Sequence, residues 1–77
     1  MKELKRRLQG LEPYFFDVCF YEENFIIVRC TDRDFKMDFE LMGKLIEIST
    51  DIKNKYNIRV EYVTTEYYKD LNFEMVW

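Results

Sequence analysis

The longest regular pattern of apolar positions in the chain runs through residues 38–56. Apolar residues recur there at helical spacing and predict one buried stripe made by Leu41, Leu45, Ile48 and Ile52. Asp38 is expected to cap the start of this helix, and Asn57 to end it in the left-handed conformation that asparagine tolerates. The charged positions are expected largely on the opposite side of the helix: Lys36, Glu40, Lys44, Glu47, Asp51 and Lys55.

Two shorter runs are rich in aromatic and β-branched residues and predict a β-hairpin over 14–31, with a three-residue loop at 22–24. This loop pairs Tyr21 with Phe25 and Asp17 with Arg29, so that an acid faces a base across the hairpin. One face of the hairpin is then entirely apolar and is expected to pack on the long helix: Phe16, Val18, Phe20, Ile26, Val28 and Cys30. The second face is also unusually apolar for a solvated face: Phe15, Asp17, Cys19, Tyr21, Phe25, Ile27 and Arg29.

Three further segments complete the expected architecture. Residues 1–10 form a short basic helix that docks Leu4, Leu8 and Leu11, and 58–65 form a half-buried strand. A right-handed crossover through the long helix makes this strand parallel to the second hairpin strand, and we expect it beside the first, in the order 2-1-3. Residues 72–77 are expected to add an edge strand that points Phe73, Met75 and Trp77 inward, if they form a strand at all.

These elements predict a single small two-layer α+β domain with the order α-β-β-α-β(-β). A mainly antiparallel sheet of three or four strands packs on the long helix at 38–56. The chain has 77 residues, enough for one domain with a modest core.

Composition excludes several kinds of chemistry. The sequence has no histidine and only two glycines, which leaves neither the usual general base nor a glycine-rich phosphate loop. Cys19 and Cys30 fall on opposite faces of the hairpin, so we expect neither a disulfide nor a shared metal between them. The acids Asp32, Asp34 and Asp38 do not have the spacing of a calcium-binding loop and are better explained as turn formers. We therefore expect no enzyme activity, no metal and no cofactor.

Charge is unevenly distributed along the chain. The net charge is −3, yet the first ten residues carry four bases: Lys2, Lys5, Arg6 and Arg7. The remaining acidic body argues against non-specific binding to nucleic acid and favours a protein partner that carries basic charge. The sequence has neither an apolar signal region nor an apolar run long enough to span a membrane, so we expect a cytoplasmic protein that does not bind membranes.

The second face of the hairpin is the expected functional surface. We expect a small non-catalytic interaction or regulatory domain that binds a protein or forms a homo-oligomer, such as a homodimer, through Phe15, Tyr21, Phe25, Ile27, Arg29 and Arg59. Size and charge also suit a virus-encoded or archaeal inhibitor of a host factor. The alternative is a single-stranded nucleic-acid-binding module that stacks bases on the same aromatic face and contacts phosphates through Lys2, Lys5, Arg6 and Arg7.

Overall fold

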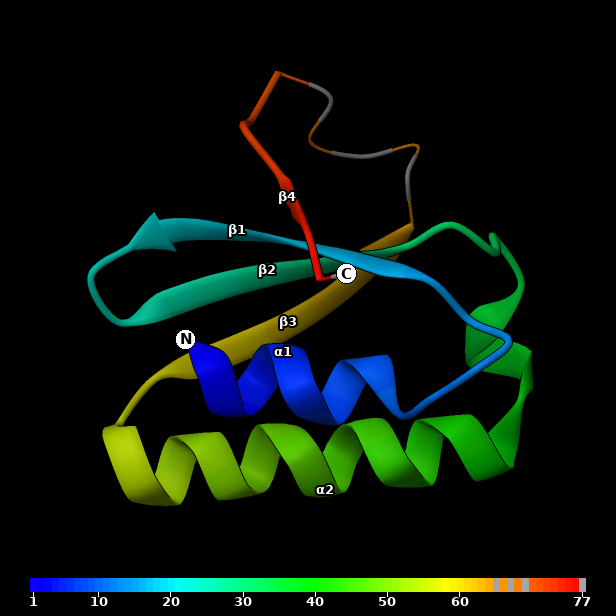
Figure 1. Cartoon of the computed structure of the whole chain (residues 1–77), viewed down its shortest axis with the longest axis horizontal. Coiled ribbons are helices and arrows are strands. Elements are labelled where there is room, and N and C mark those ends of the chain that lie inside the picture. Colours follow the sequence, from blue (N-terminus) through cyan, green and yellow to red (C-terminus); the bar gives the residue numbers. More distant parts are fainter. Residues whose placement is uncertain (65, 67, 69, 77) are drawn as a thin grey trace.

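The computed structural model describes residues 1–64, 66, 68 and 70–76. Its elements are α1 (Lys2–Gln9), β1 (Phe16–Glu22), β2 (Phe25–Cys30), a short 3-10 helix η1 (Phe35–Met37), α2 (Phe39–Tyr56), β3 (Arg59–Thr64) and β4 (Glu74–Met75). Both α-helices lie on one side of the sheet, and the described residues that lead into β4 lie on the other side (Figure 1). The expected α+β class is confirmed.

The long helix forms as the sequence predicts. The Asp38 carboxylate caps α2 by accepting a hydrogen bond from the Leu41 N–H at 3.0 Å. Asn57 ends the helix with φ at 56°, in the left-handed region. All residues of the expected stripe are buried against the sheet: Leu41, Leu45, Ile48 and Ile52.

The four strands are arranged in the order β3-β2-β1-β4. β3 is parallel to β2, as expected from a crossover through α2, but it lies directly beside β2. The predicted order 2-1-3 is therefore wrong, because the free edge of β1 is occupied by β4, which pairs antiparallel with Asp17 opposite Met75. Thr65, the last residue of the predicted third strand, lies outside the described residues.

The hairpin has the predicted register over most of its length, from Phe16 opposite Cys30 to Phe20 opposite Ile26. The predicted pairing of Tyr21 with Phe25 is wrong, because the register shifts after Phe20 and places Glu22 opposite Phe25. An extra residue in β1 produces this irregularity, as in a β-bulge. The loop is correspondingly reduced to a turn at 23–24.

The core fills the space between the sheet and the helices. α1 contributes Leu4 and Leu8, and both side chains are fully buried. The C-terminal segment contributes Val76 to the core, whereas Met75 is 55% exposed, so the expectation of an inward Met75 is wrong. Met75 pairs with Asp17 and therefore shares the face of the sheet that points away from the helices. Trp77 lies outside the described residues.

The helix-side face of the hairpin is not buried along its whole length. Phe20 was expected in the core but is 45% exposed near the hairpin turn. The Lys5 ammonium lies 5.7 Å from the centre of its ring. Within the described residues, neither helix is long and apolar enough to cross a membrane.

Candidate interaction surfaces

The centre of the second sheet face is closed. Ile27 is only 1% exposed and Cys19 only 7%, although both were expected on an accessible face. Arg29 forms two hydrogen bonds to the Asp17 carboxylate, from Nε at 3.0 Å and from Nη2 at 2.7 Å. Ile27 and Arg29 are therefore positioned as structural residues, and neither contributes much accessible surface.

The segment leading into β4 lies against this face. The Arg29 guanidinium lies 3.6 Å from the centre of the Phe73 ring, which is close stacking. Leu71 and Asn72 line the same hollow as Cys19, so this segment lies beside the buried thiol. Burial raises the pKa of the Cys19 thiol, which keeps it protonated and weakly nucleophilic.

The hairpin end is the part of the expected surface that remains accessible. Tyr21 is 47% exposed, and its ring meets Phe25 edge-to-face with 5.7 Å between the ring centres. The Arg59 guanidinium lies 5.1 Å from the centre of the Phe25 ring. Glu22 at the end of β1 and the turn residue Glu23 are exposed beside this group. We call Tyr21, Phe25 and Arg59 the hairpin-end cluster.

Phe15 precedes β1 and is 44% exposed. It lies at the opposite end of the strand from Tyr21, because β1 runs for seven residues between the chain entry and the hairpin turn. The six residues expected to form one surface are thus divided into the hairpin-end cluster, a closed centre and the distant Phe15.

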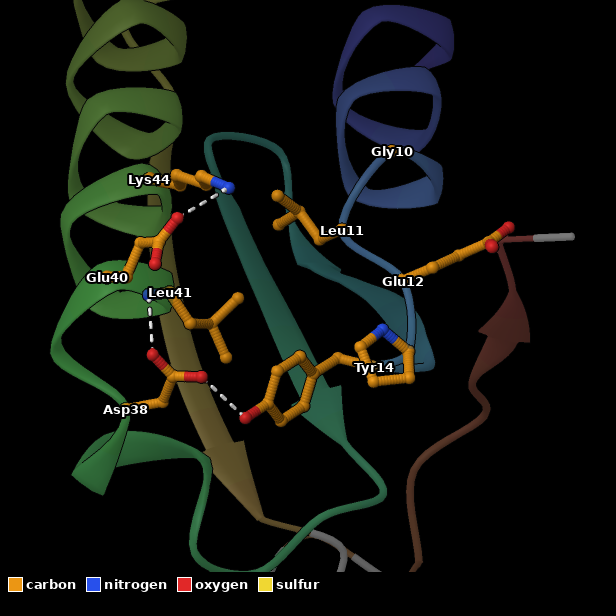
Figure 2. A pocket seen from close by; sticks show the side chains of 9 residues that line it. Gly10, Leu11, Glu12, Tyr14, Asp38, Glu40, Leu41 and Lys44 are labelled. Atoms are coloured by element: carbon orange, nitrogen blue, oxygen red, sulfur yellow. Dashed lines mark hydrogen bonds and ion pairs between the residues drawn. The ribbon is translucent and has the colours of Figure 1, made fainter.

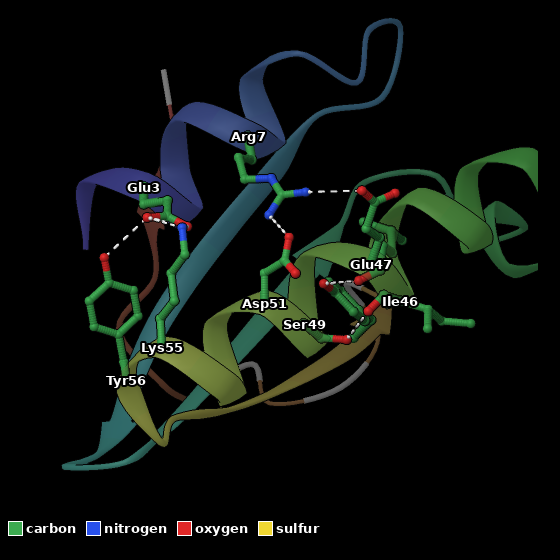
Figure 3. A network of polar contacts seen from close by, with 10 residues as sticks. Glu3, Arg7, Ile46, Glu47, Ser49, Asp51, Lys55 and Tyr56 are labelled. Carbon is green, nitrogen blue, oxygen red and sulfur yellow. Dashed lines mark hydrogen bonds and ion pairs between the residues drawn. The ribbon is translucent and has the colours of Figure 1, made fainter.

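The N-terminal bases are located on the helical side of the sheet. Lys5 forms an ion pair with Glu74 at 2.7 Å, and Arg7 forms one with Asp51 at 2.6 Å (Figure 3). Lys2 and Arg6 are exposed on α1. α1 lies on the helix side of the sheet (Figure 1). Phe25 and Arg59 alternate with Ile26 of the core and with Val60, which packs against it, so they point to the other side, and the bases of α1 do not share a surface with them.

Figure 3 also shows why the charges of α2 were misplaced by sequence reasoning. Several of them point toward α1: Arg7 lies near Glu47 and Asp51, and Lys55 contacts Glu3 at 3.1 Å. The outermost stripe of α2 is left without charge along three turns. It consists of Phe39, Gly43, Ile46 and Thr50.

This uncharged stripe contains prominent apolar side chains. Phe39 is 83% exposed and Ile46 is 58% exposed. A Cβ added to Gly43 would have no neighbouring atom within 4 Å, so the fold itself does not require glycine there. Spacing of four, three and four residues from Phe39 is the sequence signal that reveals the stripe, in the same way as it reveals the buried one.

A hollow of about 180 Å³ lies between the end of α1 and the start of α2 (Figure 2). The Tyr14 hydroxyl donates to the Asp38 carboxylate there at 2.7 Å, which raises the pKa of Tyr14 to about 12 and lowers that of Asp38. The lysine at its edge, Lys44, is 3.6 Å from Glu40. Tyr14 and Asp38, and Lys44 and Glu40, thus pair with each other within this hollow, which is typical of a structural junction.

The described residues do not meet the requirements of a metal site. Among those residues, no group of three or more Cys, Asp or Glu side chains is arranged to hold a metal ion. Comparison with family models, with curated proteins and with solved structures gave no match.

Proposed function

We propose that this protein is a small, acidic, non-catalytic interaction domain that binds a protein partner through the hairpin-end cluster. The observation that carries the proposal is the prearranged contact of Tyr21, Phe25 and Arg59 at an exposed end of the sheet. Tyrosine and arginine are frequent anchors of protein interfaces. Their mutual contacts reduce the side-chain freedom that binding has to restrict.

The charge around the cluster suggests the chemistry of the partner. Glu22 and Glu23 are exposed next to Tyr21, and the whole chain carries a net charge of −3. A partner with an apolar patch bordered by lysine or arginine would complement this end of the molecule. Such a contact suits a cytoplasmic regulatory or inhibitory protein, including one of viral or archaeal origin.

Single-stranded nucleic-acid binding has less support. That function needs several basic side chains close to the stacking aromatics, whereas Arg59 in the hairpin-end cluster is accompanied by the exposed acids Glu22 and Glu23. The helix α1, which carries the N-terminal lysines and arginines, packs on the other side of the sheet (Figure 1). Lys5 and Arg7 are in addition engaged by Glu74 and Asp51.

Affinity capture with matched variants tests the proposal. Phe20 and Tyr21 are neighbours of almost equal exposure, 45% and 47%, but Phe20 lies on the helix side of the sheet. We expect Tyr21→Ala and Phe25→Ala to lose a protein that the wild type retains, and Phe20→Ala to keep it. Equal loss in Phe20→Ala contradicts a hairpin-end site. Titration with labelled oligonucleotides at two salt concentrations covers the alternative, for which a steep salt dependence is expected.

A further inference from the structure

The outer edge of β3 has no pairing strand among the described residues. The Arg59 N–H donates to the Asn24 carbonyl at 2.9 Å, which directs the backbone of Arg59, and of every second residue after it, toward β2. The backbone groups of Val60, Tyr62 and Thr64 therefore point away from β2. Within the described part of the chain, β3 pairs with β2 alone.

This edge lacks the usual features that prevent pairing with another chain. Natural edge strands are commonly shortened, bulged, or interrupted by lysine or proline. β3 has six residues, RVEYVT, without lysine, proline or glycine, and four of them are β-branched or aromatic. The opposite edge of the sheet is the two-residue strand β4. The long open edge is thus on the β3 side.

The flank of α2 beside this edge carries one exposed apolar side chain, Ile46, among polar residues. Shallow hollows lie along β3, and the one at its start has a largely polar lining: Ser49, Thr50, Lys53, Asn54, Arg59 and Val60. The Tyr62 hydroxyl donates to the Leu45 carbonyl at 2.7 Å, which brings the middle of β3 level with the middle of α2. Met42 and Ile46 lie on the side of α2 that faces away from α1, and Ile46 is 58% exposed.

We propose that the occupant of this edge is a second copy of the chain, joined by antiparallel pairing of β3 with its counterpart around a two-fold axis at Tyr62. A two-fold contact presents the same patch twice, so the flank of α2 that carries Ile46 meets the same flank of the partner. The two sheets then form one continuous sheet, with the two α2 helices side by side on the same surface. This dimer uses the outer edge of β3, whereas the hairpin-end cluster lies on the sheet face that points away from the helices, so the inference goes beyond the proposed function.

The register follows from the direction of the backbone and from charge. In an antiparallel pair, residues whose backbone N–H and C=O groups point away from β2 must face residues of the same kind in the partner. The two-fold axis of the dimer therefore passes through a residue of β3. An axis at Glu61 would place two glutamates directly opposite one another, which is destabilising. An axis at Tyr62 pairs Glu61 with Val63 of the partner subunit and Val60 with Thr64 of the partner subunit. It also brings both copies of Ile46 close to the axis.

The β3 strands alone would bury too little surface for a stable dimer, so α2 must also contribute to the interface. A stable interface typically buries about 800 Å² on each partner, and a five-residue strand pair alone buries less. The exposed Ile46 side chain, with the partly buried Met42 beside it, supplies additional apolar area next to the strand. We therefore expect a dimer with a dissociation constant in the micromolar range, held jointly by backbone hydrogen bonds and by the helix flank.

Sedimentation of the full chain across the micromolar range tests the dimer. Val60→Pro removes an N–H that points away from β2, so the variant keeps its β2 pairing but loses a hydrogen bond to the partner. Ile46→Lys places two like charges near the axis. We expect either substitution to weaken the dimer at least about tenfold. Matched controls are Val60→Thr, which keeps the N–H, and Met75→Lys, which alters a residue of similar exposure on the opposite edge.

Hydrogen exchange gives a second measurement that does not depend on variants. The amides of Val60 and Tyr62 should exchange more slowly as protein concentration rises, while that of Arg59 should not change. A wild type that is monomeric throughout this range overturns the proposal, as does a dimer that survives both Val60→Pro and Ile46→Lys. A dimer broken by Tyr21→Ala but not by Ile46→Lys assigns self-association to the hairpin-end cluster. If no protein partner is captured but the dimer is intact, the proposed function is contradicted and the dimer is not.

Discussion

Asp17 and Arg29 face each other across β1 and β2 and are joined by two hydrogen bonds. Both side chains are largely buried, with 14% and 17% of their surface exposed. The pair fixes the hairpin register, and Arg29 also supports the Phe73 ring. A charged pair in the sheet thus holds the segment that closes the second face.

The first prediction concerns this pair. Arg29→Ala leaves the Asp17 carboxylate without its partner in a largely buried position, and we expect a loss of about 2 kcal/mol in unfolding free energy. Arg29→Lys keeps the charge but not the two-pronged geometry and should lose less. Urea denaturation of the three proteins measures the difference. Equal stability of wild type and Arg29→Ala contradicts a structural role for the pair.

The second prediction concerns access to Cys19. Phe73→Ala removes the ring that stacks on Arg29, a contact worth about 1 kcal/mol, so opening of the C-terminal segment should increase about fivefold. We expect a thiol reagent to label Cys19 faster by that factor, while labelling of Cys30 in the core stays unchanged. Mass spectrometry distinguishes the two sites. Equal acceleration at both cysteines would instead indicate a general loss of stability.

The third prediction concerns Gly43. Alanine is favoured over glycine in a helix interior by about 1 kcal/mol, and a Cβ at Gly43 meets no atom within 4 Å. Gly43→Ala should therefore raise the melting temperature. Gly10→Ala is the comparison, because a Cβ there lies 3.5 Å from the Arg7 carbonyl at the end of α1, where helix propensity counts less. A destabilised Gly43→Ala variant would reveal a close contact made outside the monomer.

The fourth prediction concerns pH. The hydrogen bond from Tyr14 lowers the pKa of Asp38 below its ordinary 3.8, so its stabilising contribution is present above 3.8 and is lost as pH falls through the lowered pKa. The pKa of Tyr14 is raised from 10.0 to about 12, so its contribution is present below 10.0 and is lost as pH rises through the raised value.

Tyr14→Phe tests this dependence, because it removes the hydroxyl and retains the ring. The variant should be less stable than wild type by a constant amount between these limits, and the difference should shrink in acid. Tyr21→Phe is the control, since the Tyr21 hydroxyl forms no hydrogen bond to a carboxylate within the described residues, and it should match wild type throughout. A difference for Tyr14→Phe that persists in strong acid would contradict the assigned hydrogen bond.

Local patterns in the sequence were sufficient to predict the helices and the hairpin. The stripe from Leu41 to Ile52 and the cap at Asp38 are read directly from spacing. The hairpin register followed from two requirements satisfied together, one apolar face and Asp17 opposite Arg29. The register shift after Phe20 was not predicted, because a one-residue bulge near a turn barely changes the alternation of apolar and polar residues.

Contacts between distant segments were not predictable in the same way. The right-handed crossover rule sets the direction of β3 but not its neighbour, and the order depended on β4 taking the edge of β1. The closed centre of the second face depends on Phe73 stacking on Arg29, for which the sequence has no periodic signal. Sequence patterns therefore predicted Ile27 as accessible, although it is buried, and did not predict the exposed Ile46. Ile46 is left uncovered because charged residues of α2 such as Asp51 point toward α1.

The unequal lengths of the two edge strands limit how copies of this molecule can aggregate. Fibrils that grow by strand addition need a pairing edge on each side of every subunit, so that one molecule can bind the next without end. Here β3 offers six residues and β4 only two. In the proposed dimer both β3 edges are used and only the two-residue β4 edges remain, so growth through the sheet would stop at the dimer. A mutation that lengthened β4 would remove that protection.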